Sequence, residues 1–237
     1  MSSDRPIDDV ADGVDRNADR TAIRAEHDAL ARALVAVLAA DLGVPRAGER
    51  LVVGIAGESG SGKSITATSL ARALTAAGFA TGVVHQDDYF VRPPRTNHAH
   101  RLRDLASVGP QEVDLARIER HVADFRAGRD GVLAPLVDYP GDRFLTRRRD
   151  FSSLVVLVVE GTYALHLADL DVRVFLAATH AETAERRRLR ARDPHEPIVD
   201  RILGIEHALI APQRARAHVV IDRDFRIVER PARRAGT

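Results

Sequence analysis

The sequence predicts an α/β fold, a parallel β-sheet with helices on both faces. Five short apolar runs of strand length alternate with segments in which apolar residues recur at helical spacing, and the runs cover residues 51–56, 81–85, 154–159, 172–176 and 218–221. Runs without polar alternation are expected for strands buried on both faces, and strands interleaved with helices favour a parallel sheet. A chain of 237 residues has the length of one such domain with additional segments.

The segments before and after this core differ from it in composition. Residues 1–20 carry many Asp residues and little apolar content, so we expect a mobile acidic tail. Residues 21–48 contain leucine and valine at helical spacing and then a Gly-Val-Pro stop, which predicts an N-terminal amphipathic helix and a linker. The main domain is expected over 49–225, and a C-terminal tail over 226–237.

Two helices are expected around the second strand. The first covers 63–77, because Leu70 and Leu74 stand at helical spacing and Gly78 follows as a stop. The second is amphipathic, covers 112–127 and lies between the second and third strands. The long segment between these two strands is where we expect an inserted substrate-binding subdomain.

One glycine-rich segment carries a specific motif. Residues 57–64 read Gly-Glu-Ser-Gly-Ser-Gly-Lys-Ser and match G-x-x-x-x-G-K-[ST], between a predicted strand and a predicted helix. Glycines let successive backbone N–H groups point inward at phosphate oxygens. The sequence therefore predicts a P-loop that binds a nucleoside triphosphate. Its residues are Gly57, Glu58, Ser59, Gly60, Ser61, Gly62, Lys63, Ser64 and Ile65.

The lysine of this motif is the only one in the chain. Lys63 stands against 34 arginines, so the sequence places arginine at every other basic position apart from histidine. An ammonium is a compact point charge that fits between phosphate oxygens, whereas a guanidinium is bulkier and forked. We therefore expect Lys63 to contact the β- and γ-phosphates.

Acidic residues follow two other predicted strands. Asp87 and Asp88 come shortly after the strand 81–85, and Glu160 closes the apolar run 154–159. Side chains at the carboxyl ends of strands face the crevice where open α/β sheets bind ligands. One carboxylate there can accept a hydroxyl proton during phosphoryl transfer, and another can hold Mg²⁺. The residues alone leave two alternatives open, since the Asp pair could begin a turn and Glu160 could start a helix.

Together these segments resemble the uridine kinase and phosphoribulokinase superfamily, which also includes nicotinamide riboside kinases. The resemblance runs loosely over 50–222 and is carried by residues 57–64, 86–90 and 159–163. It implies a P-loop fold with a five-stranded parallel sheet, and a kinase that uses ATP and Mg²⁺. It also implies a role for each matching residue: Asp87 as general base, Lys63 as phosphate clamp, and Ser64 and Glu160 as magnesium ligands.

An arginine-rich segment follows the fourth strand. Thr179-His180-Ala181-Glu182 reads as a capping box that opens a helix, which would carry Arg188 and Arg192 four residues apart on one face. In the family that the chain resembles, an arginine-bearing lid closes over the transferring phosphate, which implies catalytic roles for Arg188 and Arg192. A solvated basic face or a patch for nucleic acid would give the same pattern.

The resemblance is weaker where the phosphate acceptor would bind. Nucleoside kinases of this group carry an Asp-His-Pro segment and a loop with Tyr-Asp, whereas the comparable stretches here read Val-Gly-Pro-Gln-Glu over 108–112 and Asp-Tyr-Pro-Gly-Asp-Arg over 138–143. The first lacks the Asp-His pair, and the second has Asp and Tyr in changed order. Each candidate substrate-binding residue could instead shape a loop, and these residues are Asp88, Tyr89, Glu112, Asp138, Tyr139 and Arg143.

The composition excludes several kinds of site. The chain has no cysteine, which excludes disulfides and thiolate zinc sites, and its histidines show no spacing typical of metal ligands. A formal net charge of +1 gives no general attraction to nucleic acid, and the longest apolar run is too short to span a bilayer. The N-terminus is polar and acidic rather than basic and then apolar, so we expect no secretory signal. We expect a cytoplasmic protein without membrane or nucleic-acid partners, and the sequence allows a homo-oligomer.

The leading functional hypothesis is a kinase that uses ATP and Mg²⁺ to phosphorylate a hydroxyl of a small molecule, above all a nucleoside or related ribosyl compound. A regulatory GTPase would need an Asn-Lys-x-Asp motif and hence a second lysine, and a protein kinase would need His-Arg-Asp and Asp-Phe-Gly triplets. The sequence has none of these. A non-catalytic or regulatory ATP-binding module that acts through a partner stays open.

Overall fold

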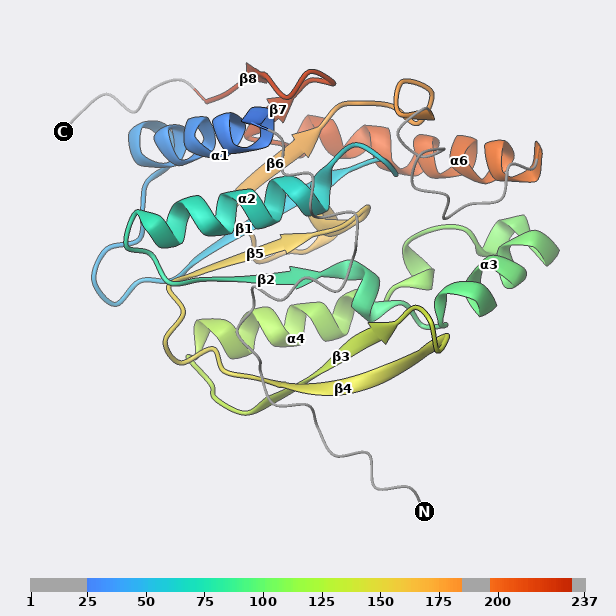
Figure 1. The fold of residues 1–237 in the computed structure, drawn as a ribbon, viewed down its shortest axis with the longest axis horizontal. Coiled ribbons are helices and arrows are strands. Elements are labelled where there is room, and N and C mark those ends of the chain that lie inside the picture. Colours follow the sequence, from blue (N-terminus) through green and yellow to red (C-terminus); the bar gives the residue numbers. More distant parts are fainter. Residues whose placement is uncertain (1–24, 185–196, 232–237) are drawn as a thin grey trace.

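A six-stranded sheet in the order β2-β5-β1-β6-β7-β8 forms the centre of the computed structural model, which describes residues 25–184 and 197–231 (Figure 1). Its strands are β1 (Leu51–Gly57), β2 (Thr81–His85), β5 (Val156–Glu160), β6 (Val172–Leu176), β7 (Val219–Ile221) and β8 (Ile227–Glu229). The first five of these pair in parallel, whereas β8 is antiparallel to β7. The parallel α/β sheet is confirmed, and the antiparallel edge strand is an addition that the sequence pattern does not predict.

Helices cover both faces of the sheet (Figure 1). Within β1, Val53 and Ile55 join the core formed with the helices of one face, whereas Val52 and Ala56 join the core of the opposite face. Successive side chains of a strand point to opposite faces, so an unbroken apolar run suits a strand covered on both sides. The first face carries α1 (Ala25–Val37) and α2 (Lys63–Ala76), and the second carries α4 (Leu115–Arg126).

The N-terminal helix α1 belongs to the core. Its residues Leu30, Leu34 and Val37 are buried in the same cluster as Leu70 of α2 and Val53 of β1. The helical spacing predicts one helix up to residue 42, and the structure ends it with a π-helical turn over Leu38–Leu42 before Gly43. Residues 21–24 of the predicted helix lie outside the described part of the chain.

The segment between β2 and β5 forms the predicted insertion. It contains α3 (Pro94–Arg103), α4 and a two-stranded antiparallel hairpin of β3 (Val132–Asp138) and β4 (Arg143–Arg149), which lies beside α4 (Figure 1). The hairpin does not follow from the sequence pattern, because β4 reads Arg-Phe-Leu-Thr-Arg-Arg-Arg and lacks both an apolar run and a regular alternation. After β6 the described chain resumes with α6 (Pro197–Ile210). Short 3₁₀ turns cover Gln86–Tyr89, Leu105–Ser107, Pro110–Glu112, Ala164–His166 and Ala211–Arg216.

The carboxyl ends of three neighbouring strands meet at one edge of the sheet. In the register, His85 of β2 pairs with Glu160 of β5, and Glu160 pairs with Ile55 of β1, two residues before the P-loop. The segments that follow β2, β5 and β1 therefore start side by side. This edge positions the candidate site.

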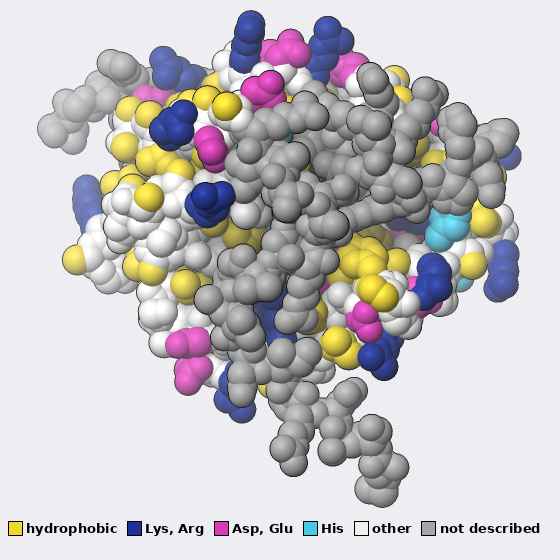
Figure 2. Space-filling model, viewed as in Figure 1, with side chains coloured by type: hydrophobic (Ala, Val, Ile, Leu, Met, Phe, Trp, Pro, Cys, Tyr) yellow, Lys and Arg dark blue, Asp and Glu magenta, His cyan; other side chains and the backbone are white. Residues whose placement is uncertain are grey.

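Ile227–Glu229, predicted as part of a C-terminal tail, forms β8. The boundaries proposed from the sequence, with a main domain over 49–225, otherwise stay predictions. Basic and acidic side chains are interspersed over the coloured part of the surface in Figure 2, in line with a formal net charge of +1. Within the described residues, each helix is too short or too polar to cross a bilayer.

Candidate active site

The P-loop connects β1 directly to the start of α2. Gly62, the residue before α2, has a φ of 100°, in the left-handed region that favours glycine. A Cβ at this position would stand 2.8 Å from the ring of Phe225, so the loop also lacks room for a side chain here. The backbone turns sharply at Gly62 and leads into the N-terminal end of α2, where unpaired N–H groups favour an anion.

Polar groups of the loop are arranged for a ligand with several acceptor oxygens. Lys63 Nζ donates to the backbone carbonyl of Glu58 at 2.9 Å, which holds the ammonium across the loop. Ser61 is buried, and its Oγ has no hydrogen-bond partner among the described residues. Ser59 accepts a hydrogen bond from Thr183 Oγ1 at 3.0 Å through its carbonyl, and Ile65 is half-buried on the first turn of α2. An ammonium and an unsatisfied buried hydroxyl beside a helix start fit the phosphates of a nucleotide.

Ser64 and Glu160 meet at the end of the loop. Ser64 Oγ donates to Glu160 Oε1 at 3.0 Å, and His85 Nδ1 lies 2.8 Å from the same oxygen. Glu160 is 4% exposed. Burial opposes its ionisation, but the hydrogen bond and charge of His85, with Lys63 and Ser64, outweigh burial and lower the pKa of Glu160. An ionised carboxylate beside a serine hydroxyl fits Mg²⁺, which prefers oxygen ligands.

Asp87 lies across from this pair. The segment Gln86–Tyr89 forms a 3₁₀ turn directly after β2. Asp87 keeps an exposed surface, and its Oδ2 accepts a hydrogen bond from the Tyr139 hydroxyl at 3.0 Å. The partial removal of the carboxyl from bulk water raises the pKa of Asp87, and the charge of Glu160 raises it further, whereas Lys63 and Tyr139 act in the opposite direction.

The Asp87 turn and the residues after Glu160 pack directly on each other. Gln86 is fully buried, and its Oε1 accepts a hydrogen bond from the backbone N–H of Tyr163 at 2.8 Å. A Cβ on Gly161 would stand 2.2 Å from Cβ of Gln86, so this close approach requires glycine. The two candidate carboxylates, Asp87 and Glu160, are thus fixed relative to each other by the backbone that carries them.

Asp88 and Tyr89 contact the surrounding protein instead of the Asp87–Glu160 site. Asp88 Oδ1 accepts from the backbone N–H of Val137 at 2.9 Å, and its Oδ2 lies 3.2 Å from a guanidinium nitrogen of Arg147. Both oxygens therefore hold the β3–β4 hairpin. Tyr89 is buried, its hydroxyl lies 2.7 Å from His121 Nδ1 on α4, and burial raises its pKa to about 12. The structure places these two predicted substrate contacts in the frame around the site.

Glu112 also lies inside this frame. It is 1% exposed and accepts hydrogen bonds from Arg101 at 2.6 and 2.9 Å and from Asn97 at 2.8 Å, both on α3. Arg101 also pairs with Glu206 of α6 at 3.1 Å. Glu112 therefore ties its 3₁₀ turn to α3, and Arg101 ties α3 to α6. The Glu112 carboxylate is occupied by protein donors.

The hairpin turn carries the last three predicted acceptor contacts. Asp138 and Arg143 form an ion pair at 2.9 Å, and the pKa of Asp138 is lowered first by the backbone N–H of Gly141 and then by Arg143. Tyr139, the residue after Asp138, donates its hydroxyl to Asp87. Of the six predicted substrate-binding residues, Tyr139 is the one that the structure brings to the candidate base.

The predicted capping box is present at the start of the lid region. Thr179 donates its backbone N–H to Glu182 Oε2 at 2.9 Å, and Glu182 N–H reaches Thr179 Oγ1 at 3.3 Å. Arg188 and Arg192 lie outside the described residues, so their predicted catalytic roles stay predictions.

The sequence reasoning missed two features of the site. His85 contacts Glu160, and its place opposite Glu160 in the strand register is the signal that could have indicated this contact. Glu58, His180 and His207 come together from distant segments, and their spacing in the sequence gives no sign of it.

Comparisons with known proteins give the family of this chain. Residues 52–226 match the model of the Phosphoribulokinase / Uridine kinase family, which is most of the chain. The chain belongs to this family. The match covers all three strand ends of the candidate site, so the suspected resemblance is confirmed.

The proteins similar to this chain differ in the substrates that their names give. The chain is 30% identical over 194 residues to the bifunctional alpha-galactosidase/sucrose kinase AgaSK of Mediterraneibacter gnavus. The aligned region covers 76% of this chain but only 21% of that polypeptide. It is 27% identical over 184 residues to the uridine kinase of Macrococcus caseolyticus, covering 72% of this chain and 86% of that enzyme. The phosphoribulokinase structure from Rhodobacter spheroides superposes with a TM-score of 0.55 at 16% identity, covering 78% of this chain and 77% of the other, and shows the shared fold.

Proposed function

We propose that this chain is an ATP- and Mg²⁺-dependent kinase that transfers the γ-phosphoryl group to a hydroxyl of a small molecule. The observation that carries the proposal is the convergence of three strand ends: Lys63 in the P-loop after β1, Glu160 at the end of β5 and Asp87 just after β2. Phosphoryl transfer needs positioned charges around the phosphates and a proton acceptor for the attacking hydroxyl. These three positions supply both.

Each residue has a distinct part in the reaction. Asp87 accepts the proton of the acceptor hydroxyl as the oxygen attacks the γ-phosphorus, and its raised pKa brings it closer to the operating pH of a general base. Lys63 exchanges the Glu58 carbonyl for phosphate oxygens and stabilises the negative charge of the transferring group. Ser64 and Glu160 would hold Mg²⁺, which would neutralise negative charge on the phosphates. Arg188 and Arg192 are proposed to complete the charge stabilisation from the lid.

For the acceptor, we propose a nucleoside or related ribosyl compound. The 27% identity to a uridine kinase of nearly the same extent supports this class. Tyr139 stands where an acceptor would meet Asp87, and its hydroxyl can pass its hydrogen bond from Asp87 to a substrate oxygen. Asp138 and Arg143 beside it offer further polar groups at the open hairpin turn.

A free saccharide is the second candidate acceptor. The identity of 30% to AgaSK over 194 residues favours it, because that protein is named as a sucrose kinase in one of its two functions. Phosphorylation of a saccharide hydroxyl needs the same base and the same phosphate-binding groups. Lys63, Ser64, Glu160 and Asp87 therefore do not distinguish a saccharide acceptor from a nucleoside acceptor.

An ADP-release assay with ATP and Mg²⁺ tests the proposal across nucleosides, nicotinamide riboside, pantothenate, glycerate, sugar phosphates and free saccharides. We expect strong turnover with one acceptor class and none without Mg²⁺. Phosphorylated product must be identified, and Asp87→Asn is the control for turnover that does not use the candidate base. ATP binding with no phosphorylated product from any acceptor would instead support the non-catalytic module. Cytoplasmic residence stays a prediction.

A further inference from the structure

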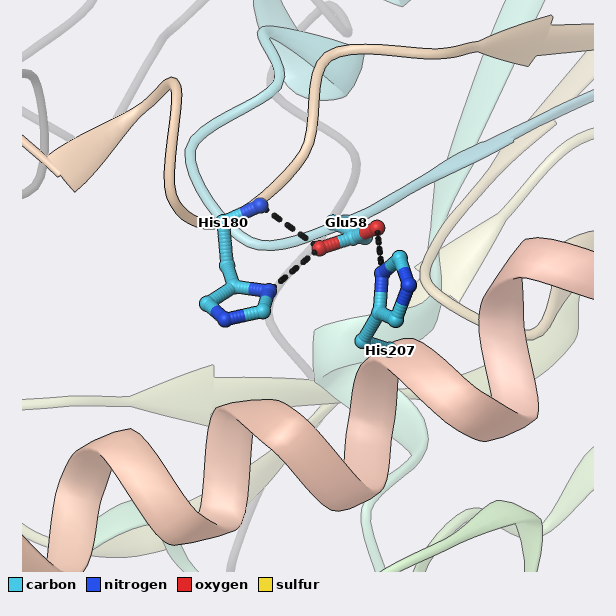
Figure 3. Close-up of side chains that lie close together, drawn as sticks. All are labelled: Glu58, His180 and His207. Atoms are coloured by element: carbon cyan, nitrogen blue, oxygen red, sulfur yellow. Dashed lines mark hydrogen bonds and ion pairs between the residues drawn. The ribbon is translucent and has the colours of Figure 1, made fainter.

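Three ligand-type side chains, one of them from the P-loop, meet beside that loop (Figure 3). Glu58 is the second residue of the P-loop, His180 lies in the segment after β6, and His207 projects from α6. One atom from each, a carboxylate oxygen or an imidazole nitrogen, lies within 4.8 Å of the others. We propose that Glu58, His180 and His207 form a binding site for a divalent transition-metal ion of the Zn²⁺ class.

The carboxylate is held between the two imidazoles. His207 Nδ1 lies 2.7 Å from Glu58 Oε1, and His180 Nδ1 lies 3.0 Å from Oε2, so the rings approach opposite oxygens of one carboxylate (Figure 3). The backbone N–H of His180 donates to Oε2 as well, at 2.6 Å. Glu58 is 5% exposed, whereas both histidines are partly open to solvent. A buried, oriented carboxylate with two accessible imidazoles is a preorganised donor set with a route for an ion.

The spacing of these atoms suits a small tetrahedral ion. Zn²⁺ binds nitrogen and oxygen at about 2.0–2.2 Å, which puts two ligands of one tetrahedral ion about 3.4 Å apart. The present Nδ1–oxygen contacts of 2.7 and 3.0 Å would have to open by roughly 0.4–0.7 Å to reach this separation. In the metal-bound state each imidazole would carry its proton on Nε2, so that the Nδ1 lone pair faces the ion. Three protein ligands leave a fourth position for water.

The donor types favour a transition metal over Mg²⁺. Imidazole suits Zn²⁺, Co²⁺ and Ni²⁺, whereas Mg²⁺ prefers carboxylate, hydroxyl and phosphate oxygens. The Ser64–Glu160 pair offers only oxygen ligands, so the two positions should prefer different metal ions.

The position of Glu58 gives the ion a consequence for the P-loop. A carboxylate in a loop that binds phosphates adds negative charge where the ligand is negative. A divalent ion would add two positive charges beside this carboxylate. It would also tie the P-loop to the segment after β6 and to α6, between which the predicted lid lies. We therefore expect the ion to strengthen ATP binding. This expected effect rests on the proposed function, whereas the proposal of the metal site is independent of that function.

The first experiment measures metal binding alone. Tag-free full-length protein is treated with chelator and titrated with Co²⁺ and Zn²⁺ in excess Mg²⁺, by visible absorption and calorimetry. We expect one tight site, and His180→Gln and His207→Gln should each weaken it by more than the roughly 10- to 100-fold that loss of an outer-shell partner costs. Glutamine can still donate a hydrogen bond to Glu58, so these variants separate metal binding from a hydrogen-bonded latch. Thermal melting without metal checks that they fold.

His85→Gln is the matched control, because His85 contacts Glu160 through the same ring atom at a similar distance. We expect its Zn²⁺ affinity at the proposed site to stay within twofold of wild type. Equal Zn²⁺ affinity in wild type and His207→Gln, or loss of the tight site in His85→Gln, would overturn the proposal.

The second experiment measures ATP binding with and without one equivalent of Zn²⁺. Zn²⁺ should tighten ATP binding at least about fivefold in wild type, the lower end of ordinary coupling between sites, and leave His207→Gln unchanged. If the protein binds no ATP either with or without Zn²⁺, the result would count against the proposed function and not against the metal site. Tight Zn²⁺ binding without any effect on ATP would overturn the coupling.

Discussion

The phosphate side and the acceptor side of the candidate site are built in different ways. On the phosphate side, Lys63 and Glu58 contact each other within one continuous loop. On the acceptor side, Asp87 and Asp88 are positioned by Tyr139, Val137 and Arg147, about fifty residues away in the chain. The first arrangement depends on local backbone geometry and the second on the docking of a hairpin. Substitutions on the phosphate side should therefore remove chemistry at constant fold, and those on the acceptor side should mix chemistry with docking.

The largest effect should come from Lys63→Arg. The guanidinium keeps the charge but is too bulky and forked for the space between phosphate oxygens, so we expect phosphoryl transfer to fall below detection. Steady-state assays at saturating ATP with the identified acceptor test this. Arg72→Lys is the control, because it exchanges the same two residue types in the opposite direction at an exposed position of α2. This variant should keep wild-type turnover. Activity of Lys63→Arg within threefold of wild type would contradict the role of Lys63.

Asp87→Asn should give the next largest effect. The amide keeps the size of the side chain and can still accept from Tyr139, but it cannot take a proton, and loss of a general base typically lowers the rate by about 10²- to 10⁴-fold. We expect that loss in kcat with nearly unchanged ATP affinity. Single-turnover assays with calorimetric ATP binding provide the measurement, and a turnover close to wild type would remove Asp87 from the chemistry.

Asp88→Asn should act mainly on the hairpin. It removes the charge that pairs with Arg147 while one oxygen can still accept from Val137 N–H. We expect the free energy of unfolding to fall by about 1–3 kcal/mol, with acceptor KM raised more than kcat is lowered. Chemical denaturation and steady-state kinetics report the two effects. If kcat fell more in Asp88→Asn than in Asp87→Asn, the assignment of the base would be reversed.

Tyr139→Phe should have the smallest effect, a shift in pH dependence. The Tyr139 hydrogen bond lowers the pKa of Asp87, so its removal raises that pKa. The base works only when deprotonated, and the acid limb of kcat/KM should therefore move to higher pH, by roughly one unit or less. A pH profile of both proteins measures the shift. A limb that stays in place, or moves to lower pH, would show that Tyr139 does not act on the base.

The sequence predicts the phosphate side better than the acceptor side, because the first depends on local backbone geometry and the second on the docking of a hairpin. The P-loop is contiguous and its strand, loop and helix are visible as local patterns, and Glu160 stands at the end of an unbroken apolar run. The β3–β4 hairpin, by contrast, is held by Asp88 and Arg147, whose pairing depends on tertiary docking. Glu112 illustrates the same limit: an acidic residue after a Gly-Pro turn resembles a substrate contact, whereas Arg101 and Asn97 of α3 occupy its carboxylate. Patterns in the sequence indicate on which strand, helix or loop a side chain lies, and long-range packing determines which groups it contacts.

The single lysine makes the P-loop chemically addressable. Amine-directed reagents would find one side-chain target in this chain, at the position whose Nζ lies against the Glu58 carbonyl, and a lysine-specific protease would find one peptide bond, at the start of α2. Acylation of Lys63 or cleavage after it would thus report directly on whether the loop is covered. Occupancy by any ligand could be followed by mass spectrometry in a mixture, without a label, an engineered cysteine or knowledge of the acceptor.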